Sequence, residues 1–317
     1  MALQYLATDD YIHGFELFRA RYDDKNSMKR SGPMTGPIFG NTTHLLQKET
    51  DVSNKAILIS HELGFGDVIN FIRFVPILKQ KGAKAIYILV RNPLWRLMQY
   101  NYGNICEVPQ IGDKIDINYH LPVIDLPYIL ETRASSVPYQ SGYLTVAPQD
   151  SRASFQQLFL DNEKKQIAIV WRGNPDHGRD AIRSMELEVF LAHLPVEAKE
   201  ANLYSLQFQP TEQEKAVLSK YGIINLGNFF EDFYDTACAM KNLDALISVD
   251  TSVVHLGGAM NVRTFVLLDA VCDWRWSPTK STPENNWYES VSCCRQSTAG
   301  DWGSAFKQIT LEPKPTI

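Results

Sequence analysis

The stretch Ala245–Met260, ALISVDTSVVHLGGAM, carries a strand, a sharp turn and a helix in immediate succession. It begins with a short apolar run, which is typical of a buried strand in a parallel sheet. Asp250 follows the strand, and Thr251 and Ser252 carry the short hydroxyl side chains that often begin helices. Another β-branched run, Thr264–Leu268, comes after the helix. This strand–helix–strand order predicts a parallel α/β sheet.

The same alternation extends in both directions from this stretch. In the second half we expect strands at Ile167–Trp171, Asn202–Gln207 and Ile223–Leu226, and helices at Leu187–Leu194, Glu212–Tyr221, Thr236–Asn242 and Val253–Met260. In the first half we expect strands at Ala56–Ser60 and Ala85–Val90, weaker ones near Ile105–Val108, Tyr119–Leu121 and Tyr143–Val146, and helices at Asp67–Lys79 and Asn92–Tyr100. Two successive α/β halves without an internal repeat predict two Rossmann-like domains that face a cleft.

These patterns also set the expected domain boundaries. The first residues contain a helical spacing at Asp10–Tyr22 and a Gly- and Pro-rich loop at Ser31–Gly40, and Asp301–Ile309 reads as a closing helix. We therefore divide the chain into four parts. They are an N-terminal helical segment with its loop, a first Rossmann-like domain, a second Rossmann-like domain and a C-terminal helix with tail, at residues 1–50, 51–150, 151–295 and 296–317.

Composition narrows the class of protein. Hydrophobic residues make up 44% and charged residues 21%, which is the range of globular proteins. The net charge of −5 and the lack of a Lys/Arg block argue against a nucleic-acid-binding surface. No apolar run approaches the ~20 residues that span a bilayer, and the N-terminus lacks a signal-peptide pattern. The five cysteines lack CxxC spacing, so we expect reduced thiols in a soluble, cytoplasmic protein.

The first loop of chemical interest is His61–Asp67, HELGFGD, between an expected strand and helix. Gly64 and Gly66 let the backbone approach a ligand closely, and the helix N-terminus favours an anion. As a dinucleotide fingerprint the loop is incomplete, because Ile69 occupies the third glycine position. The loop is therefore a candidate acceptor or phosphate loop.

Asp67 itself allows two interpretations. It either caps the helix, or it acts as a general base that removes the proton of an acceptor hydroxyl. His61 and Glu62 are alternatives for the role of base.

The second loop is Trp171–Asn174, WRGN, followed by Arg179 and Arg183. The planar fork of a guanidinium pairs with two phosphate oxygens, so Arg172 at the strand end is expected to contact phosphate. Asn174 and Arg183 are further candidates in this segment, whereas Arg179 is expected at the surface.

The third loop, Asp250–His255, is the most specific. The N–H groups of Thr251, Ser252 and Val253 at the helix start could hold a nucleotide diphosphate without a metal. His255 lies one turn further, within reach of a leaving phosphate. The alternative is a capped helix with a buried histidine.

Other motifs are absent or ambiguous. No DxD, GxxxxGK[ST], HExxH or GxSxG occurs, which removes the usual carboxylate motif of metal-dependent sugar transfer. We therefore expect no metal site. Asp232 and Asp235 precede a helix, where capping competes with a binding role. The aromatic segment Asp273–Trp276 could stack on a ligand or pack in the core.

Six motifs occur in a recognisable order between residues 55 and 310: LGFGDVINFIRFVPILKQKGA (63–83), IVWRGNPDHGRDAIRS (169–184), DFYDTACAMKNLDALISVDTSVVHLGGAM (232–260), DWRW (273–276), WY (287–288) and GDW (300–302). This order resembles the glycosyltransferase domain that follows tetratricopeptide repeats in bacterial proteins. That domain is similar to the heptosyltransferase family.

The resemblance implies the GT-B fold, with the donor nucleotide bound by the second domain and a C-terminal helix that crosses back to the first. It also implies an inverting mechanism without a metal or other cofactor. It makes residues 51–150 the acceptor domain and residues 151–295 the nucleotide-sugar domain. Carried over position by position, it makes Asp67 the base and places His255 in the donor-binding segment. We expect His255 to take part in catalysis there by stabilising the departing diphosphate. The donor-binding residues that it implies are Arg172, Asn174, Gln207, Asp232, Asp235, Asp250, Thr251 and Ser252.

We therefore predict a metal-independent, inverting glycosyltransferase that uses a nucleotide-diphosphate sugar. No 34-residue repeat array is present to recruit an acceptor, so a protein, a glycan and a modified nucleobase of a nucleic acid all stay open, as does the oligomeric state. Two alternatives also stay open. One is a non-catalytic glycan- or protein-binding module of the same fold, and the other is a sugar-nucleotide epimerase.

Overall fold

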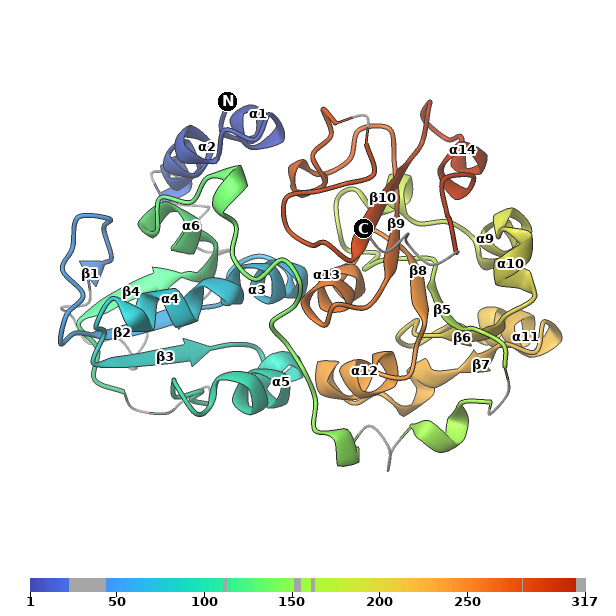
Figure 1. Cartoon of the computed structure of the whole chain (residues 1–317), viewed down its shortest axis with the longest axis horizontal. Coiled ribbons are helices and arrows are strands. Elements are labelled where there is room, and N and C mark those ends of the chain that lie inside the picture. The colour runs from blue at the N-terminus through green and yellow to red at the C-terminus, as the bar shows by residue number, and fades with distance from the viewer. Residues whose placement is uncertain are drawn as a thin grey trace.

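The structure is a computed structural model that describes residues 1–22, 44–110, 113, 115–150, 155–160, 163–280 and 282–311. The loop expected at Ser31–Gly40 lies outside the described residues. Two parallel sheets, each flanked by helices, lie side by side (Figure 1). We refer to the halves that carry them as the first and the second domain.

The first sheet has the order β1-β4-β2-β3, and every neighbouring pair is parallel. Its strands are β1 (His44–Leu45), β2 (Ala56–Ser60), β3 (Ala85–Leu89) and β4 (Tyr119–Pro122). Its helices are α3 (Phe65–Phe71), η2 (Ile72–Phe74), α4 (Val75–Gln80), α5 (Asn92–Tyr102), η3 (Val123–Asp125), α6 (Leu126–Ile129) and η4 (Ala134–Ser136). The fold class predicted for this half is confirmed, with β1 as an additional edge strand.

Three local expectations in this half were wrong. The single helix expected at Asp67–Lys79 is divided into α3, η2 and α4, because Pro76 has no N–H to continue the helical hydrogen bonds. Residues 105–108 form no strand, and Glu107 makes only an isolated bridge to Tyr87. The segment Tyr143–Val146 is not a strand either, because its first two N–H groups donate to the carbonyl of Ala259 in the second domain.

The second sheet has the order β10-β9-β8-β5-β6-β7 and is also parallel throughout. Its strands are β5 (Gln166–Val170), β6 (Asn202–Ser205), β7 (Ile224–Asn225), β8 (Ala245–Val249), β9 (Thr264–Leu268) and β10 (Val291–Arg295). Its helices are η5 (Gln156–Leu158), α8 (Asp180–Arg183), α9 (Leu187–His193), α10 (Val196–Lys199), α11 (Glu212–Lys220), η6 (Leu226–Phe229), α12 (Phe233–Met240), α13 (Ser252–Ala259), η7 (Trp274–Trp276) and α14 (Trp302–Phe306). Sequence analysis missed β10, whose VSCCR sequence lacks the expected β-branched run.

The C-terminal helix α14 stays with the second domain. It packs on α9, β9 and β10, and the ring of Phe306 meets that of Phe190 edge to face, with centroids 5.1 Å apart. The expectation that this helix crosses back to the first domain is therefore wrong up to Leu311, the last described residue.

The N-terminal helices α1 (Ala2–Ala7) and α2 (Tyr11–Phe18), followed by η1 (Arg19–Tyr22), bridge the domains instead (Figure 1). Tyr11 stacks on Trp287 of the second domain at a centroid distance of 5.3 Å. In the other direction, Arg19 forms an ion pair of 3.0 Å with Asp125 of the first domain. The apolar spacing of this segment thus serves to cover the junction of the two halves.

Two helix pairs form direct contacts between the domains, α3 with α13 and α5 with α12 (Figure 1). A Cβ atom placed on Gly66 of α3 would lie 3.4 Å from the Cα of Ser252 on α13. The N-termini of these two helices therefore meet at the boundary of the domains. In the part of the chain that the structure describes, no helix is long and apolar enough to cross a membrane.

Candidate functional site

A cleft of about 580 Å³ lies between the two domains. Its walls are the loops that follow β2, β3, β5, β8 and β9, so it sits at the carboxyl ends of the strands, where open α/β sheets bind ligands. The predicted residues among its lining are Gly64, Gly66, Asp67, Asn174, Arg183, Asp250, Thr251, Ser252 and His255. Residues outside the predicted site complete it: Leu63, Phe65, Arg91, Asp176, His177, Arg179, Asp269, Asp273, Arg275 and Trp276.

Asp67 lines this cleft from the first turn of α3. One carboxylate oxygen accepts the N–H of Gly64 at 2.8 Å, and the other forms an ion pair with Arg275 of the second domain. Desolvation raises the pKa of the Asp67 carboxyl, although the cation of Arg275 opposes this. The carboxylate is thus a stronger base than a solvated aspartate, and it also holds the start of its helix.

Arg275 is fixed by its own neighbours. Its Nη1 donates to Asp273 at 2.8 Å, and its guanidinium lies 4.4 Å from the ring centroid of Trp274. Burial lowers the pKa of Arg275, but the carboxylates of Asp67 and Asp273 outweigh this and raise it, so the residue stays cationic. Arg275 therefore presents a permanent positive charge in the cleft.

His255 is 6% exposed and lies on α13. Its ring stacks on Trp276 with centroids 5.0 Å apart, and its Nδ1 lies 3.0 Å from the hydroxyl of Tyr288. Burial, reinforced by the charge of Arg275, lowers the pKa of His255 to about 3. The imidazole is therefore neutral near pH 7.

The N-terminus of α13 lines the cleft. Thr251 is its N-cap, and within the described residues its side chain makes no capping hydrogen bond. Arg183 reaches the same place and donates to the carbonyl of Asp250 at 2.9 Å. Arg179, expected to be a surface residue, lines the cleft with a 44% exposed side chain paired to Asp269. Two guanidinium groups and a helix N-terminus thus converge on one side of the cleft.

Asp250 is the acidic member of this group. Desolvation raises the pKa of its carboxyl to about 7, and the carboxylate of Asp273 adds to the effect. A side chain with this pKa changes charge within the physiological range. It can receive or repel an anionic ligand depending on pH.

Several predicted residues lie outside the cleft lining. The guanidinium of Arg172 turns away and binds Glu214 of α11 through Nε at 2.8 Å and Nη2 at 3.0 Å. Gln207 is buried and accepts the N–H of Arg172 at 3.2 Å. Asn174, in contrast, lies at the exposed rim of the cleft.

Asp232 and Asp235 also have another partner. Asp232 caps α12, and both carboxylates bind Arg96 of α5, with Asp232 at 2.7 and 2.9 Å. These side chains join the two domains rather than line the cleft. His61 and Val253 flank it: the N–H of His61 donates to Leu89, and Val253 packs against the core.

The most important residue that sequence analysis left unassigned is Arg275. Its only signal was its position in DWRW directly after the last expected strand, which suggested aromatic packing as readily as binding. That its cation meets Asp67, 208 positions away, follows from the approach of the two domains. Spacing along the chain carries no such information.

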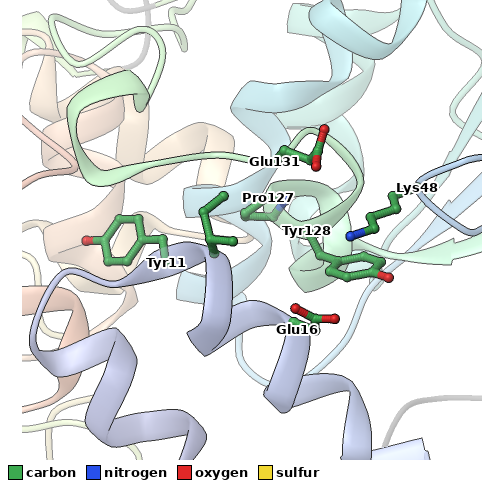
Figure 2. Close-up of a pocket in the computed structure, with 7 residues that line it drawn as sticks. Tyr11, Glu16, Lys48, Pro127, Tyr128 and Glu131 are labelled. Atoms are coloured by element: carbon green, nitrogen blue, oxygen red, sulfur yellow. The ribbon is translucent and has the colours of Figure 1, made fainter.

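A second, much smaller pocket lies between α2 and α6 (Figure 2). It has a volume of about 20 Å³ and is lined by Tyr11, Ile12, Glu16, Lys48, Pro127, Tyr128 and Glu131. That is room for about one water molecule, so this pocket is no candidate for a substrate site. Among the described residues, no group of three or more His, Cys, Asp or Glu side chains could hold a metal ion.

Comparison with known proteins gives similarity at the level of structure. No protein-family model and no curated protein matches the sequence. A glycosyltransferase family 9 structure from Veillonella parvula aligns over 83% of this chain and 92% of its own, with a TM-score of 0.56 and 14% identity. The Escherichia coli ADP-heptose lipopolysaccharide heptosyltransferase II aligns over 80% and 96%, with a TM-score of 0.52 and 9% identity.

The E. coli heptosyltransferase WaaC, in a structure with ADP-2-deoxy-2-fluoro heptose, aligns over 81% of this chain and 96% of its own, with a TM-score of 0.50 and 10% identity. All three structures share the arrangement of two parallel α/β domains with this chain. The chain therefore has the GT-B fold of the heptosyltransferase structures.

Proposed function

We propose that this protein is an inverting, metal-independent glycosyltransferase that moves a sugar from a nucleotide-diphosphate sugar to a nucleophile, most simply a hydroxyl group. The observation that carries the proposal is the meeting of two helix starts from different domains at one cleft. One bears the carboxylate of Asp67, and the other is the N-terminus of α13 beside Arg183. A base and an anion site thus face each other across a space large enough for a sugar nucleotide.

The anion site suits the leaving group of such a transfer. The N–H groups at the start of α13 and the cations of Arg179 and Arg183 would stabilise the negative charge that develops on the departing nucleoside diphosphate. These donors need no bridging metal to do so. The structural similarity to heptosyltransferases solved with ADP or an ADP-sugar supports adenosine diphosphate as the first candidate nucleotide.

Asp67 would be the base for the acceptor. A general base is most effective when its pKa lies near the working pH, and desolvation raises the pKa of Asp67 in that direction. General-base assistance contributes about 10²–10⁴-fold to the rate. Direct attack by the deprotonated acceptor on the face opposite the diphosphate inverts the anomeric centre. The acceptor itself, whether on a protein, a glycan or a modified nucleobase, is left open by this geometry.

Isothermal titration with ADP, UDP, GDP, CDP and dTDP tests the anion site. We expect one of them to bind without added divalent metal and in the presence of a chelator. Binding by none of the five would refute the donor site, and binding only with a divalent metal would refute metal independence.

A transfer assay with the matching sugar nucleotides tests the enzyme. Asp67→Asn should abolish transfer while it leaves the affinity for the nucleoside diphosphate close to that of the wild type. Retained transfer in this variant would remove Asp67 from the role of base. Binding by the wild type without transfer to any acceptor would favour a non-catalytic module, and a changed sugar without acceptor would favour an epimerase.

A further inference from the structure

A chain of buried hydrogen bonds runs from the first domain to His255. Nδ1 of His255 lies 3.0 Å from the hydroxyl of Tyr288, and that hydroxyl lies 3.0 Å from Oδ1 of Asn70. The same Oδ1 atom accepts Nη2 of Arg73 at 3.0 Å. Arginine offers donors only, so the atom of Asn70 that faces it is the carbonyl oxygen.

This order of donors decides which ring nitrogen of His255 carries the proton. A phenol has one hydrogen, and that of Tyr288 is donated to the oxygen of Asn70. Towards His255 the hydroxyl can therefore only accept, which requires a hydrogen on Nδ1. In a neutral imidazole the other nitrogen, Nε2, then carries a lone pair and no hydrogen.

The charges around His255 keep the ring neutral. The cations of Arg275 and Arg73 face it from η7 and η2, and the carboxylate of Asp273 opposes them by favouring protonation. Desolvation acts in the same direction as the two cations. The chain of hydrogen bonds begins at Arg73, which is held in place. Its side chain is 0% exposed, and its Nη1 also donates to the carbonyl of Trp287 at 2.6 Å.

The edge of the ring that carries Nε2 faces the boundary of the domains. A Cβ atom placed on Gly66 would lie 2.6 Å from Cδ2 and 3.3 Å from Nε2 of His255. Both Gly66 and His255 line the cleft. The lone pair of Nε2 is thus held beside the first turn of α3, one residue from the proposed base.

We propose that Tyr288 is a positioning residue that holds His255 as the Nδ1–H tautomer, so that Nε2 accepts a hydrogen bond from a hydroxyl group in the cleft. This rests on the proposed function for the source of that hydroxyl, which is either the donor sugar or the acceptor. It also replaces the expectation that His255 stabilises the departing diphosphate. A neutral Nε2 without hydrogen repels a phosphate oxygen instead of binding it.

Nitrogen-15 NMR of the histidine-labelled protein tests the tautomer without any substrate. The signals of His255 are assigned by their loss in His255→Gln. We expect a protonated Nδ1 and an unprotonated Nε2 from pH 5 to 8, with no change on saturation by the tightest-binding nucleoside diphosphate. A protonated Nε2 in the free protein, or its protonation when the diphosphate binds, would overturn the proposal.

Tyr288→Phe removes the acceptor of the Nδ1 proton at almost constant volume. We expect the resonances of His255 to shift toward a mixture of tautomers, and the same spectrum establishes that the variant is folded. Tyr204→Phe is the matched control, because the hydroxyl of this buried tyrosine in β6 donates to Gln166 and accepts the N–H of Leu160, and among the described residues it makes no contact with Tyr288 or His255. Equal spectra for Tyr288→Phe and the wild type would contradict the role of Tyr288.

Binding and turnover then identify the source of the hydroxyl. Tyr288→Phe should leave the affinity for the nucleoside diphosphate unchanged. If the donor sugar supplies the hydroxyl, the sugar nucleotide binds about fivefold to tenfold more weakly, the range of one hydrogen bond. If the acceptor supplies it, kcat falls by a similar factor with unchanged donor affinity. Weaker binding of the diphosphate itself in Tyr288→Phe, or unchanged Kd, kcat and KM, would contradict the proposal. If the NMR spectra show the expected Nδ1–H tautomer but the wild type transfers no sugar, only the proposed glycosyltransferase function is contradicted.

Discussion

Asp67 of the first domain and Arg275 of the second form an ion pair across the cleft, with side chains only 16% and 10% exposed. The proposed base and its counter-charge therefore belong to different halves of the protein. Because the nearby cation lowers the pKa that desolvation raises, the proton affinity of Asp67 depends on how closely the domains approach. The ion pair thus couples the proton affinity of Asp67 to the contact between the domains.

Replacement of Arg275 by glutamine should raise the pKa of Asp67 further, since desolvation then acts unopposed. When the pKa of a carboxyl is higher in the folded than in the unfolded protein, the folded protein keeps its full stability below the unfolded-state pKa. That part of the stability is lost as the pH rises through the folded-state pKa. Arg275→Gln should therefore destabilise the protein more at pH 8 than at pH 5, by up to about 3–5 kcal/mol. Urea unfolding at the two pH values measures this, and the acidic limb of kcat/KM should move to higher pH.

Arg179→Gln is the control for this prediction. It breaks a pair in which the arginine side chain is 44% exposed, so the loss of stability should stay within about 1 kcal/mol and show little dependence on pH. Equal effects of the two substitutions would show that Asp67 does not depend on Arg275.

Gly66→Ala should separate α3 from α13. The new methyl group would lie 2.6 Å from Cδ2 of His255, closer than packed atoms allow, and the stacked ring of that histidine has little room to move. We expect a loss of about 1–3 kcal/mol, the usual effect of overpacking, together with shifted NMR signals of His255. Gly178→Ala is the control, because among the described residues no atom outside Gly178 and its two chain neighbours lies within 4 Å of the added carbon. A wild-type melting temperature for Gly66→Ala would contradict the close approach.

Arg183 and Arg172 should differ in their effect on nucleotide affinity. Arg183→Gln removes a cation beside the α13 N-terminus and should weaken nucleoside diphosphate binding by about tenfold or more, since charged hydrogen bonds contribute about 1.5–3 kcal/mol. Arg172→Gln should leave the affinity unchanged but lower stability, because its guanidinium binds Glu214. Titration calorimetry separates the two, and a reversed order would restore the sequence-based assignment of Arg172 to phosphate.

The affinity for a nucleoside diphosphate should fall as the pH rises from 6 to 8. Asp250 has a pKa of about 7, so it is largely neutral at the lower pH and becomes an anion facing an anionic ligand at the higher pH. Asp273 favours its protonation, whereas Arg183 and Arg275 oppose it. In Asp250→Asn this part of the pH dependence should disappear, while the titration of the ligand itself is common to both proteins. An identical pH dependence in the variant would exclude Asp250 as its origin.

The sequence by itself determined the class of fold and one wall of the cleft. Short apolar runs such as Ala245–Val249 and Thr264–Leu268 are typical of buried parallel strands, and the short polar residues after the first of them begin a helix. Because parallel strands end at the same edge of a sheet, the loops that follow them had to lie together, and Asp250, Thr251 and Ser252 do line the cleft. These are local properties, decided within a few residues of each other.

The tertiary structure alone decided the pairing of charges. Arg172 and Arg183 are both arginines that follow β5, yet one turns to Glu214 and the other to the start of α13. Asp232 and Asp235 meet Arg96, and Asp67 meets Arg275, because two domains approach along α5 with α12 and α3 with α13. An ion pair depends on distances of a few ångströms between segments far apart in the chain. No spacing in the sequence encodes that distance; the packing of the two sheets sets it.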